Sequence, residues 1–264
     1  MTRTLLAGGC SFTFGHELSD DIEGNTPSRK TWSSHLSNSI GANYFCTARA
    51  GSGNDGIARR VFNYIANAKE QCFVAVMWTF TSRYDWAMPR HRNLEDTRWT
   101  TITPWDTEAQ QAHVLRRLAG SDGQLRIWKR RKLDLQETGV MPFADALYRY
   151  AANNYHETYQ SWKNIVWLQN ILKKKKIPYL FTLADNTLFY DELTPLWEQD
   201  ALMNAMYREI DFDNWYTFGE RMMGFNQWAT LNDYEYGTTH PLDRAHKDAS
   251  ELMKDKFLQL YKGE

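Results

Sequence analysis

The sequence predicts an α/β fold in three layers, α/β/α, around a mainly parallel sheet. Apolar runs of strand length recur along the chain, and segments with helical spacing of apolar residues lie between them. Strands that alternate with helices form mainly parallel sheets that carry helices on both faces. The chain has 264 residues, of which 42% are hydrophobic, and this is enough for a sizeable core in one large domain.

Four apolar segments are predicted to form buried strands. The clearest is the continuous apolar run Cys72–Trp78, and the others are Thr4–Gly8, Asn43–Thr47 and Pro178–Leu183. A weaker fifth candidate lies at Trp215–Phe218. Together these segments define the expected sheet.

Helices are predicted between and after these strands. Apolar residues recur at three- and four-residue intervals over Ser28–Ser39, Gly56–Ala68, Phe143–Leu172 and Leu242–Tyr261. The third of these segments is followed by the basic run Lys173–Lys176, which suits the negative end of a helix dipole. These segments supply the helical layers of the predicted sandwich.

The segment Tyr84–Pro142 differs from the rest of the chain, because it is polar and contains no clear strand pattern. We expect residues 1–264 to form one domain with an insertion or lid at 84–142, partly helical around Thr107–Leu118. Its tryptophans would either stack on sugar rings or pack the insertion against the body. Its basic run Lys129–Lys132 would either bind phosphate or an anionic glycan, or form a solvated face.

Composition excludes several classes of protein. The formal net charge of -1 gives no reason to expect a nucleic-acid partner. No stretch approaches the roughly 18 apolar residues of a membrane span, and no signal-peptide pattern precedes the first strand, so we expect a cytoplasmic or intracellular protein. Cys10, Cys46 and Cys72 are widely spaced and odd in number, so we expect neither a disulfide framework nor a zinc site. No metal or cofactor is predicted.

Polar residues follow the predicted strands at the points where functional groups collect in an open parallel sheet. Cys10-Ser11 follows the first strand, the turn Gly51–Asn54 follows the second, and Thr79–Arg83 follows the third. His240 precedes the last helix. We therefore expect a serine, a glycine-asparagine turn, a polar turn and a histidine to meet at one edge of the sheet.

These residue types meet the needs of acyl transfer. A serine hydroxyl is a weak nucleophile that needs a base within hydrogen-bonding reach, and a histidine such as His240 suits that role. The negative oxygen of the tetrahedral intermediate needs preorganised donors. The amides of Ser11 and Gly53 and the side chain of Asn54 are candidate donors.

The motifs resemble those of the SGNH (GDSL-type) hydrolases. Gly9–Thr13 is similar to the family's first block, Gly51–Asn54 to its second, and His240-Pro241 to its last. The resemblance implies a flavodoxin-like sheet, Ser11 as nucleophile, Gly53 in the oxyanion hole and His240 as base. It also implies hydrolysis of a carboxylic ester through an acyl-enzyme, and we expect an O-acetyl or short acyl group on a carbohydrate as the substrate. The chain further resembles compact hydrolase-like proteins of bacteria and their phages.

The sequence departs from this family's pattern at three places. Cys10 stands where the first block has aspartate, and Thr79–Arg83 lacks the asparagine of the third block. Gly237 stands where an aspartate normally precedes the histidine, so Asp233 is the nearest upstream candidate for the orienting acid. Thr79, Thr81 or Arg83 could replace the missing donor, and we expect these three residues, together with Trp86, to line the substrate site.

Several alternatives remain open from the sequence alone. Ser11 could serve only as a helix cap, and Cys10 is a rival nucleophile. The stretch Gly51–Gly56 could be a phosphate loop, although it lacks the spacing of the known nucleotide-binding motifs. The chain could also keep the fold as a weakened, non-catalytic module that recognises a glycan or a protein. The sequence makes no prediction of the oligomeric state.

Overall fold

The computed structural model describes residues 3–21, 24–68, 71–88, 99–117, 122–190 and 198–262. The chain divides into two compact units, the first formed by Met1–Thr81 with Thr158–Glu264 and the second by Ser82–Glu157. The strands are β1 (Thr4–Gly8), β2 (Asn43–Cys46), β3 (Cys72–Trp78), β4 (Tyr84–Ala87), β5 (Trp99–Ile102) and β6 (Tyr179–Leu183). The α-helices are α1 (Ser11–Phe14), α2 (Trp32–Ser39), α3 (Asn54–Asn67), α4 (Glu108–Arg117), α5 (Asp122–Glu137), α6 (Val140–Tyr150), α7 (Asn154–Lys174), α9 (Ala201–Glu209), α10 (Phe225–Leu231) and α11 (Asp243–Lys262).

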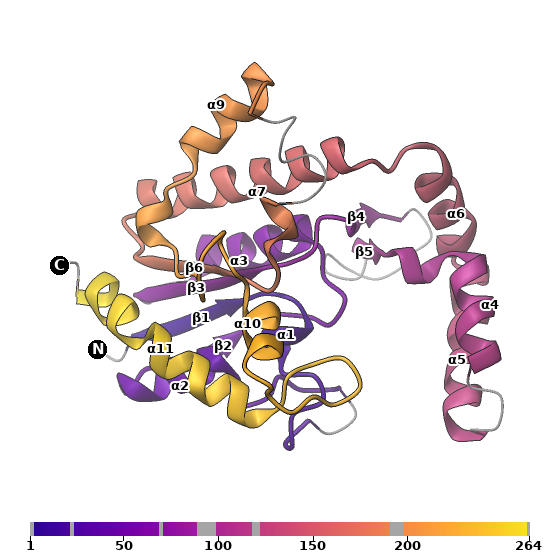
Figure 1. Cartoon of the computed structure of the whole chain (residues 1–264), viewed down its shortest axis with the longest axis horizontal. Coiled ribbons are helices and arrows are strands. Elements are labelled where there is room, and N and C mark those ends of the chain that lie inside the picture. The colour runs from indigo at the N-terminus through magenta and orange to yellow at the C-terminus, as the bar shows by residue number, and fades with distance from the viewer. Residues whose placement is uncertain are drawn as a thin grey trace. The chain divides into compact units, whose positions relative to one another are not determined.

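The first unit is built on a four-stranded parallel sheet in the order β2-β1-β3-β6. The four predicted strands therefore form the sheet, and the prediction of a mainly parallel α/β fold is confirmed (Figure 1). The fifth candidate, Trp215–Phe218, forms no strand. It contributes one isolated bridge, in which Trp215 pairs parallel to Phe181 of β6. The prediction of a fifth strand is therefore wrong, although the segment lies beside the edge of the sheet.

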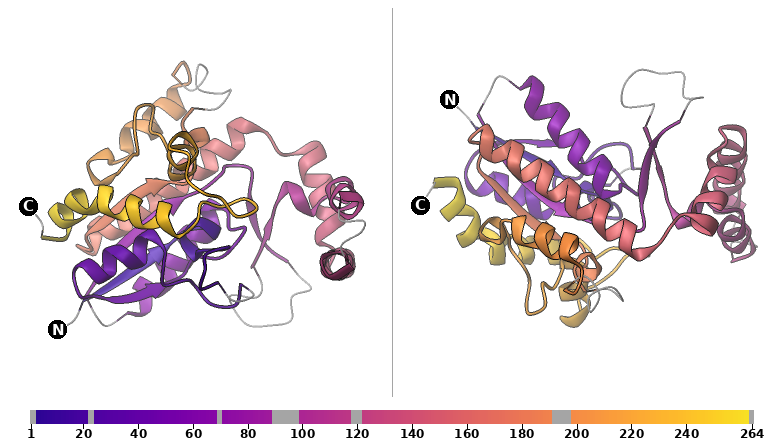
Figure 2. Two further views of the ribbon diagram at one scale, coloured as in Figure 1. Left: turned by 60° about the horizontal axis from the view of Figure 1, so that its bottom comes forward. Right: turned by 90° about the horizontal axis from the view of Figure 1, so that it is seen from above.

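Alternate residues of each strand point to opposite faces of the sheet, and this places two apolar cores on it. On β3, Val74, Val76 and Trp78 join one core, whereas Phe73 and Ala75 join the other. The first core is shared with apolar residues of α3 and α7, and the second with those of α2, α10 and α11. Figures 1 and 2 show the resulting layers, with α3 and α7 over one face and α2 and α11 over the other.

The turn after β1 is shaped by close packing at Gly9. A side-chain carbon added at Gly9 would meet the Thr13 hydroxyl oxygen at 2.2 Å, so only glycine lets α1 fold back against the end of the strand. Cys10 is the N-cap residue of α1, and Ser11 is its first helical residue. The alternative in which Ser11 is merely the cap is therefore not what the structure adopts. The turn places the Ser11 side chain at the carboxyl edge of the sheet.

The second unit contains secondary structure that the sequence pattern missed. Strands β4 and β5 form an antiparallel pair in a segment where we expected no strand. The prediction of helix around Thr107–Leu118 is confirmed by α4. Helices α4, α5 and α6 follow the strand pair, and residues including Ile102, Leu135 and Ala144 form a small core of their own. The unit runs from Ser82 to Glu157, whereas the insertion was predicted over 84–142.

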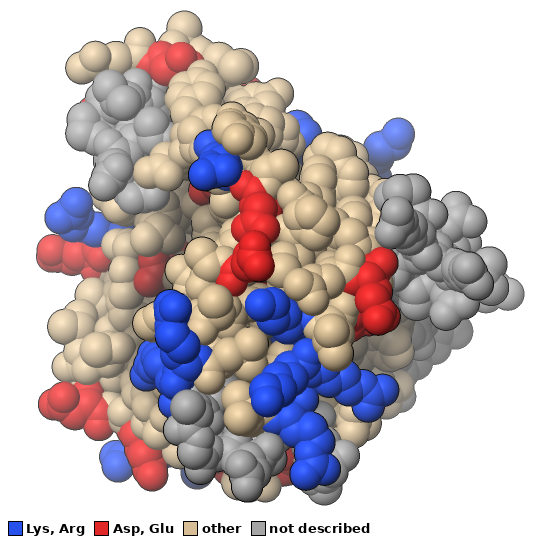
Figure 3. All heavy atoms as spheres, turned by 90° about the vertical axis from the view of Figure 1, so that its right-hand side faces the viewer, with Lys and Arg blue, Asp and Glu red and all other residues tan. Residues whose placement is uncertain are grey.

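The predicted helix Phe143–Leu172 is two helices, α6 and α7, because the chain leaves helical conformation after Tyr150. Figure 3 shows several Lys and Arg side chains, drawn in blue, on one face of the protein. On α5 of the second unit, Arg131 pairs with Asp106 at 2.9 Å, while Lys129 and Arg130 are exposed. Among the described residues, no helix is both long and apolar enough to cross a bilayer.

Candidate active site

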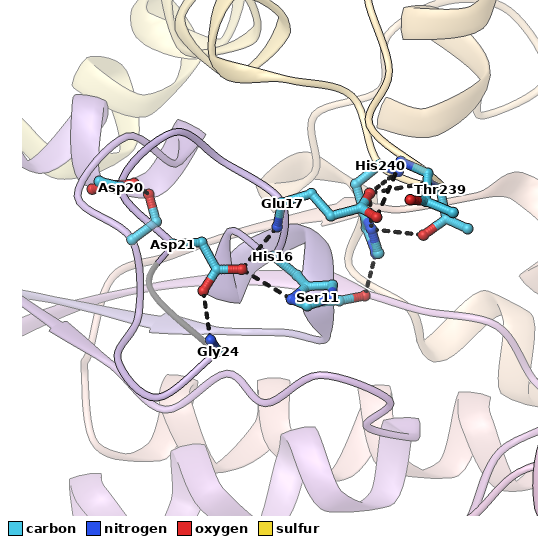
Figure 4. A network of polar contacts seen from close by, with 10 residues as sticks. Ser11, His16, Glu17, Asp20, Asp21, Gly24, Thr239 and His240 are labelled. Atoms are coloured by element: carbon cyan, nitrogen blue, oxygen red, sulfur yellow. Dashed lines mark hydrogen bonds and ion pairs between the residues drawn. The ribbon is translucent and has the colours of Figure 1, made fainter. Parts of the chain in front are cut away.

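Ser11 and His240 come from opposite ends of the chain and meet in the folded protein. The Ser11 hydroxyl oxygen lies 2.7 Å from Nε2 of His240, at hydrogen-bonding distance (Figure 4). Ser11 stands on α1 directly after β1, and His240 stands in the turn that leads into α11. Both residues are nearly buried, with 6% and 8% of their surfaces exposed. The structure thus brings together the two residues that the sequence marks as nucleophile and base.

The turn that carries His240 is closed by its own backbone. Tyr236 and Pro241 form an isolated antiparallel bridge, and the N–H of Gly237 donates to the carbonyl of His240 at 2.9 Å. This geometry turns the next three backbone N–H groups toward one point. Such a run of inward N–H groups forms a small anion-binding cup.

The carboxylate of Glu17 fills this cup. Its Oε1 accepts from the N–H of Thr238 at 3.1 Å, and its Oε2 accepts from the N–H groups of Thr239 and His240 at 3.0 and 2.9 Å. Oε2 also lies 3.0 Å from Nδ1 of His240. Burial alone would raise the pKa of Glu17, but the hydrogen bonds from Thr239 and His240 outweigh it and lower the pKa from 4.5 to about 2.

These contacts fix which ring nitrogen of His240 carries the proton. An ionised carboxylate can only accept, so Nδ1 holds a hydrogen and donates it to Glu17. The hydroxyl of Thr239, 2.9 Å from Nδ1, shares this position. In the neutral ring, Nε2 then has a free electron pair and accepts the hydroxyl hydrogen of Ser11. The three side chains therefore form a hydrogen-bonded chain in which the serine proton points at a base.

Glu17 reaches the histidine from a loop that follows α1. Its backbone is in the left-handed region, with φ of 70°, where an L-residue is strained. Asp21 holds this conformation by accepting the N–H of Glu17 at 2.9 Å. The same loop is tied to the start of α11, because Ser19 donates its backbone N–H to Asp243 at 3.0 Å. The loop thus carries the acid to the histidine of a distant segment.

The carboxylate in contact with His240 is Glu17, which the sequence pattern missed, and not Asp233. Asp233 is exposed, and among the described residues its side chain forms no hydrogen bond or ion pair with His240. A side-chain carbon added at Gly237 would meet Oε2 of Glu17 at 2.8 Å. The Glu17 carboxylate therefore occupies the space beside the position where an aspartate was expected. The glycine at 237 was the available signal that another residue supplies the acid.

Asn54 has a different place from the oxyanion donor expected from the sequence. Its Nδ2 donates to the carbonyl of Thr79 and to the hydroxyl of Ser161, both at 3.0 Å. Its Oδ1 accepts the N–H of Thr79 at 2.9 Å. Both amide hydrogens are used within the protein, so Asn54 joins the start of α3 to the end of β3 and has none left for a substrate oxygen.

Two backbone amides remain as candidate oxyanion donors. Among the residues that the structure describes, the N–H groups of Ser11 and Gly53 donate to no protein acceptor. Gly53 is the residue before the first turn of α3. Its loop is aligned with that of Ser11, because the N–H of Arg49 donates to the carbonyl of Gly9 at 3.3 Å. The side chain of Arg60 also braces this loop by donating to the carbonyl of Thr47 at 2.9 Å.

The remaining predicted residues are distributed over both units. Thr79 and Thr81 are buried in the first unit, and the backbone of Thr79 is engaged by Asn54. Arg83 and Trp86 belong to the second unit, where Trp86 is exposed. A substrate-binding role for these four residues stays a prediction. Cys10, the rival nucleophile, is fully buried in the second of the two sheet cores. Within the described parts of the chain, no three His, Cys, Asp or Glu residues are grouped as a metal site would require.

No protein-family model and no curated protein sequence matches the chain. Among solved structures, it is similar to a G-D-S-L family lipolytic protein from Desulfitobacterium hafniense, with 10% identity and a TM-score of 0.42 over 97% of this chain and 99% of that one. It is also similar to the psychrotrophic esterase EstA from Pseudoalteromonas, with 10% identity and a TM-score of 0.44 over 99% of this chain and 97% of that one.

A further similar structure is a carbohydrate esterase family 2 enzyme with a carbohydrate-binding domain from Corynascus thermopiles (Myceliophthora fergusii). The identity is 11% and the TM-score 0.47, over 99% of this chain and 67% of that one. The chemistry of the site in this chain therefore follows from its own side chains and not from these likenesses.

Proposed function

We propose that the protein is a serine hydrolase that cleaves a carboxylic ester through an acyl-enzyme. The observation that carries the proposal is the 2.7 Å distance between the Ser11 hydroxyl and Nε2 of His240, with Glu17 holding the opposite ring nitrogen. A serine, a base within reach and a third group that orients the base are the arrangement that makes a hydroxyl nucleophilic.

In the first half of the reaction, Ser11 Oγ attacks the ester carbonyl carbon while His240 Nε2 takes the hydroxyl proton. The ring becomes an imidazolium, which the ionised carboxylate of Glu17 stabilises at Nδ1. The tetrahedral intermediate then collapses, the bond to the alcohol oxygen breaks, and His240 returns the proton to that oxygen. The alcohol leaves, and the acyl group stays on Ser11.

In the second half, water replaces the alcohol and the same groups act in reverse order. His240 takes a proton from water, the hydroxide attacks the acyl carbon, and Ser11 leaves with the proton restored. We assign the oxyanion in both halves to the backbone amides of Ser11 and Gly53. One such donor contributes about 10²–10³-fold in turnover.

A short acyl group on a carbohydrate remains our proposed substrate. The alternative, a non-catalytic binding module, gains no support from the site. A protein that only binds has no need of a buried serine whose proton is aimed at an oriented histidine, and that alignment uses a strained residue, Glu17, at φ of 70°.

Hydrolysis of 4-nitrophenyl acetate tests the proposal. The wild type releases 4-nitrophenol, and Ser11→Ala lowers kcat by about 10³-fold or more. Ser250→Ala is the matched control, because Ser250 is equally buried but donates only to the carbonyl of Lys247 within α11. A fluorophosphonate probe attaches to Ser11 in the wild type. Equal rates in wild type and Ser11→Ala, or no adduct on Ser11 in folded protein, would contradict the proposal.

A further inference from the structure

A second histidine lies beside the proposed active site and takes no part in the Ser11–His240–Glu17 chain. The rings of His16 and His240 are 5.5 Å apart between centroids and meet edge to face at 87°. The N–H of His16 donates to the carbonyl of Ser11 at 3.1 Å, which ties its backbone to that of the nucleophile. Its side chain is 44% exposed, so solvent and ligands can reach it.

A nearly buried carboxylate fixes this exposed ring. The side chain of Asp21 is 6% exposed, and its Oδ2 lies 3.0 Å from Nδ1 of His16. Asp21 is itself held by the backbone, since Oδ2 accepts the N–H of Glu17 at 2.9 Å and Oδ1 accepts that of Gly24 at 3.0 Å. Figure 4 shows Asp21 between His16 and Gly24, on the loop that also carries Glu17. The orientation of the His16 ring is therefore set by the fold and not by solvent.

The contact with Asp21 also determines what His16 offers to a ligand. The carboxylate only accepts, so Nδ1 of His16 faces Asp21 and Nε2 is the ring nitrogen that is left for a ligand. Among the described residues, none forms a hydrogen bond with Nε2 of His16. The site therefore presents an oriented ring nitrogen next to the catalytic histidine, without a partner from the described parts of the protein.

The charges nearby favour a neutral ligand group. The carboxylates of Glu17 and Asp21 both lie in the loop that holds His16, so an incoming carboxylate or phosphate would meet two negative charges at short range. A hydroxyl group meets no such repulsion, and because it both donates and accepts, it can form a hydrogen bond with Nε2 in either protonation state of the ring. Partly acylated sugars and other polyols carry a free hydroxyl on the carbon next to the one that bears the ester oxygen.

We propose that His16, oriented by Asp21, is a specificity-determining residue that forms a hydrogen bond with a substrate hydroxyl next to the ester attacked by Ser11. This inference rests on the proposed esterase function and narrows its substrate to acyl esters of polyols, with carbohydrates as the main class. His16 binds the alcohol part of the substrate and exchanges no proton in the reaction.

Three substrates separate binding by His16 from a general loss of activity. The first is a methyl xyloside with one acetyl group next to a free hydroxyl, the second is the same compound with that hydroxyl replaced by hydrogen, and the third is 4-nitrophenyl acetate. We expect the wild type to prefer the first over the second by about tenfold in kcat/KM, the effect of one hydrogen bond. His16→Phe keeps a ring against His240 and removes the ring nitrogen, so the preference disappears. His16→Gln, whose side chain can donate and accept, restores part of it.

The results distinguish this inference from the proposed function. Equal discrimination in wild type and His16→Phe, or equal losses on all three substrates in a variant whose thermal midpoint matches that of the wild type, overturns the role of His16. Cleavage of 4-nitrophenyl acetate but not of either xyloside overturns the polyol substrate and leaves the esterase standing. A wild type that cleaves none of the three, or whose rates survive Ser11→Ala, contradicts the esterase itself, and the role of His16 falls with it.

Discussion

Glu17 and His240 are separated by 223 positions in the chain, yet their side chains lie 3.0 Å apart. Because Ser11 is only six residues before Glu17, one short segment after β1 supplies both the proposed nucleophile and the proposed acid. The histidine alone comes from the far end of the chain. The cup of three N–H groups around Glu17 joins the two segments, so the same carboxylate orients the base and holds its turn in place.

We predict that Glu17→Gln lowers kcat for 4-nitrophenyl acetate by about 10³-fold, the scale of losing the charge that orients and stabilises a catalytic histidine. A glutamine is neutral, and its NH₂ group would face the inward N–H groups of the turn. The pKa of Glu17 is about 2, so the wild-type carboxylate stays ionised over the whole range of an esterase assay. Glutamine does not titrate, so raising the pH cannot return the missing charge to the variant, and a pH–rate profile of both proteins measures this.

Asp233→Asn is the matched control for this prediction. It removes a carboxylate that lies close to His240 in the sequence. This carboxylate is exposed and does not contact the histidine ring. We expect its kcat to stay within about twofold of the wild type, as for most surface substitutions. A large loss in Asp233→Asn together with a small one in Glu17→Gln would reverse the assignment of the acid.

A second prediction concerns Gly237. Gly237→Ala adds a carbon that would lie 2.8 Å from Oε2 of Glu17, so the carboxylate must move and kcat falls by about tenfold or more. In a Glu17→Ala background that space is empty, and Gly237→Asp can place a new carboxylate near Nδ1 of His240. We expect the double variant to be about tenfold faster than Glu17→Ala alone. No gain over Glu17→Ala would show that position 237 cannot serve as the source of the acid.

Sequence patterns identified the sheet and two of the three aligned side chains for physical reasons. Buried parallel strands are continuous apolar runs, so β1 and β3 were predicted with their observed bounds. Functional groups of such sheets follow the ends of strands, and Ser11 stands shortly after the end of β1. His240 stands before a clear amphipathic helix, α11.

The third side chain could not be predicted in the same way. Glu17 lies in a loop without periodicity, and its position depends on a positive φ that Asp21 stabilises. Likewise, the sequence pattern around Asn54 is equally consistent with a donor to the substrate and with a structural hydrogen-bonding role. Only its bonds to Thr79 and Ser161 distinguish the two roles. Contacts between distant segments decide both cases, and they leave no local pattern in the sequence.

The role of Asn54 leads to a third prediction. Asn54→Ala removes three buried hydrogen bonds, two to the backbone of Thr79 and one to the hydroxyl of Ser161, and we expect the free energy of unfolding to fall by about 2–4 kcal/mol. Urea denaturation followed by fluorescence measures this loss. An oxyanion donor behaves differently, because its removal lowers kcat by about 10²–10³-fold with little change in stability. A stable but slow Asn54→Ala variant would return Asn54 to the oxyanion hole.

A fourth prediction concerns stability against pH. His246 is fully buried on α11, where its Nδ1 accepts the N–H of Trp32 at 3.2 Å. Burial, reinforced by the nearby charges of His240 and His35, lowers the pKa of His246 from 6.5 to about 3. His246 therefore takes up a proton below about pH 6.5 in the unfolded chain, whereas in the folded chain it stays neutral until the pH approaches 3. This contribution to stability is complete above pH 6.5 and is lost progressively as the pH falls toward 3.

Between pH 7 and pH 5 this linkage amounts to about 2 kcal/mol of unfolding free energy. His246→Asn keeps an acceptor for Trp32 but cannot titrate, so its stability starts lower and falls less over this interval. The exposed His113→Asn serves as control and follows the wild type. Glu17 does not interfere over this interval. Its pKa is 4.5 in the unfolded chain and about 2 in the folded one, so its contribution to stability is lost only at a pH below 4.5. Urea midpoints at pH 7 and pH 5 measure this difference. An equal loss of stability between the two pH values in wild type and His246→Asn would exclude His246 as its source.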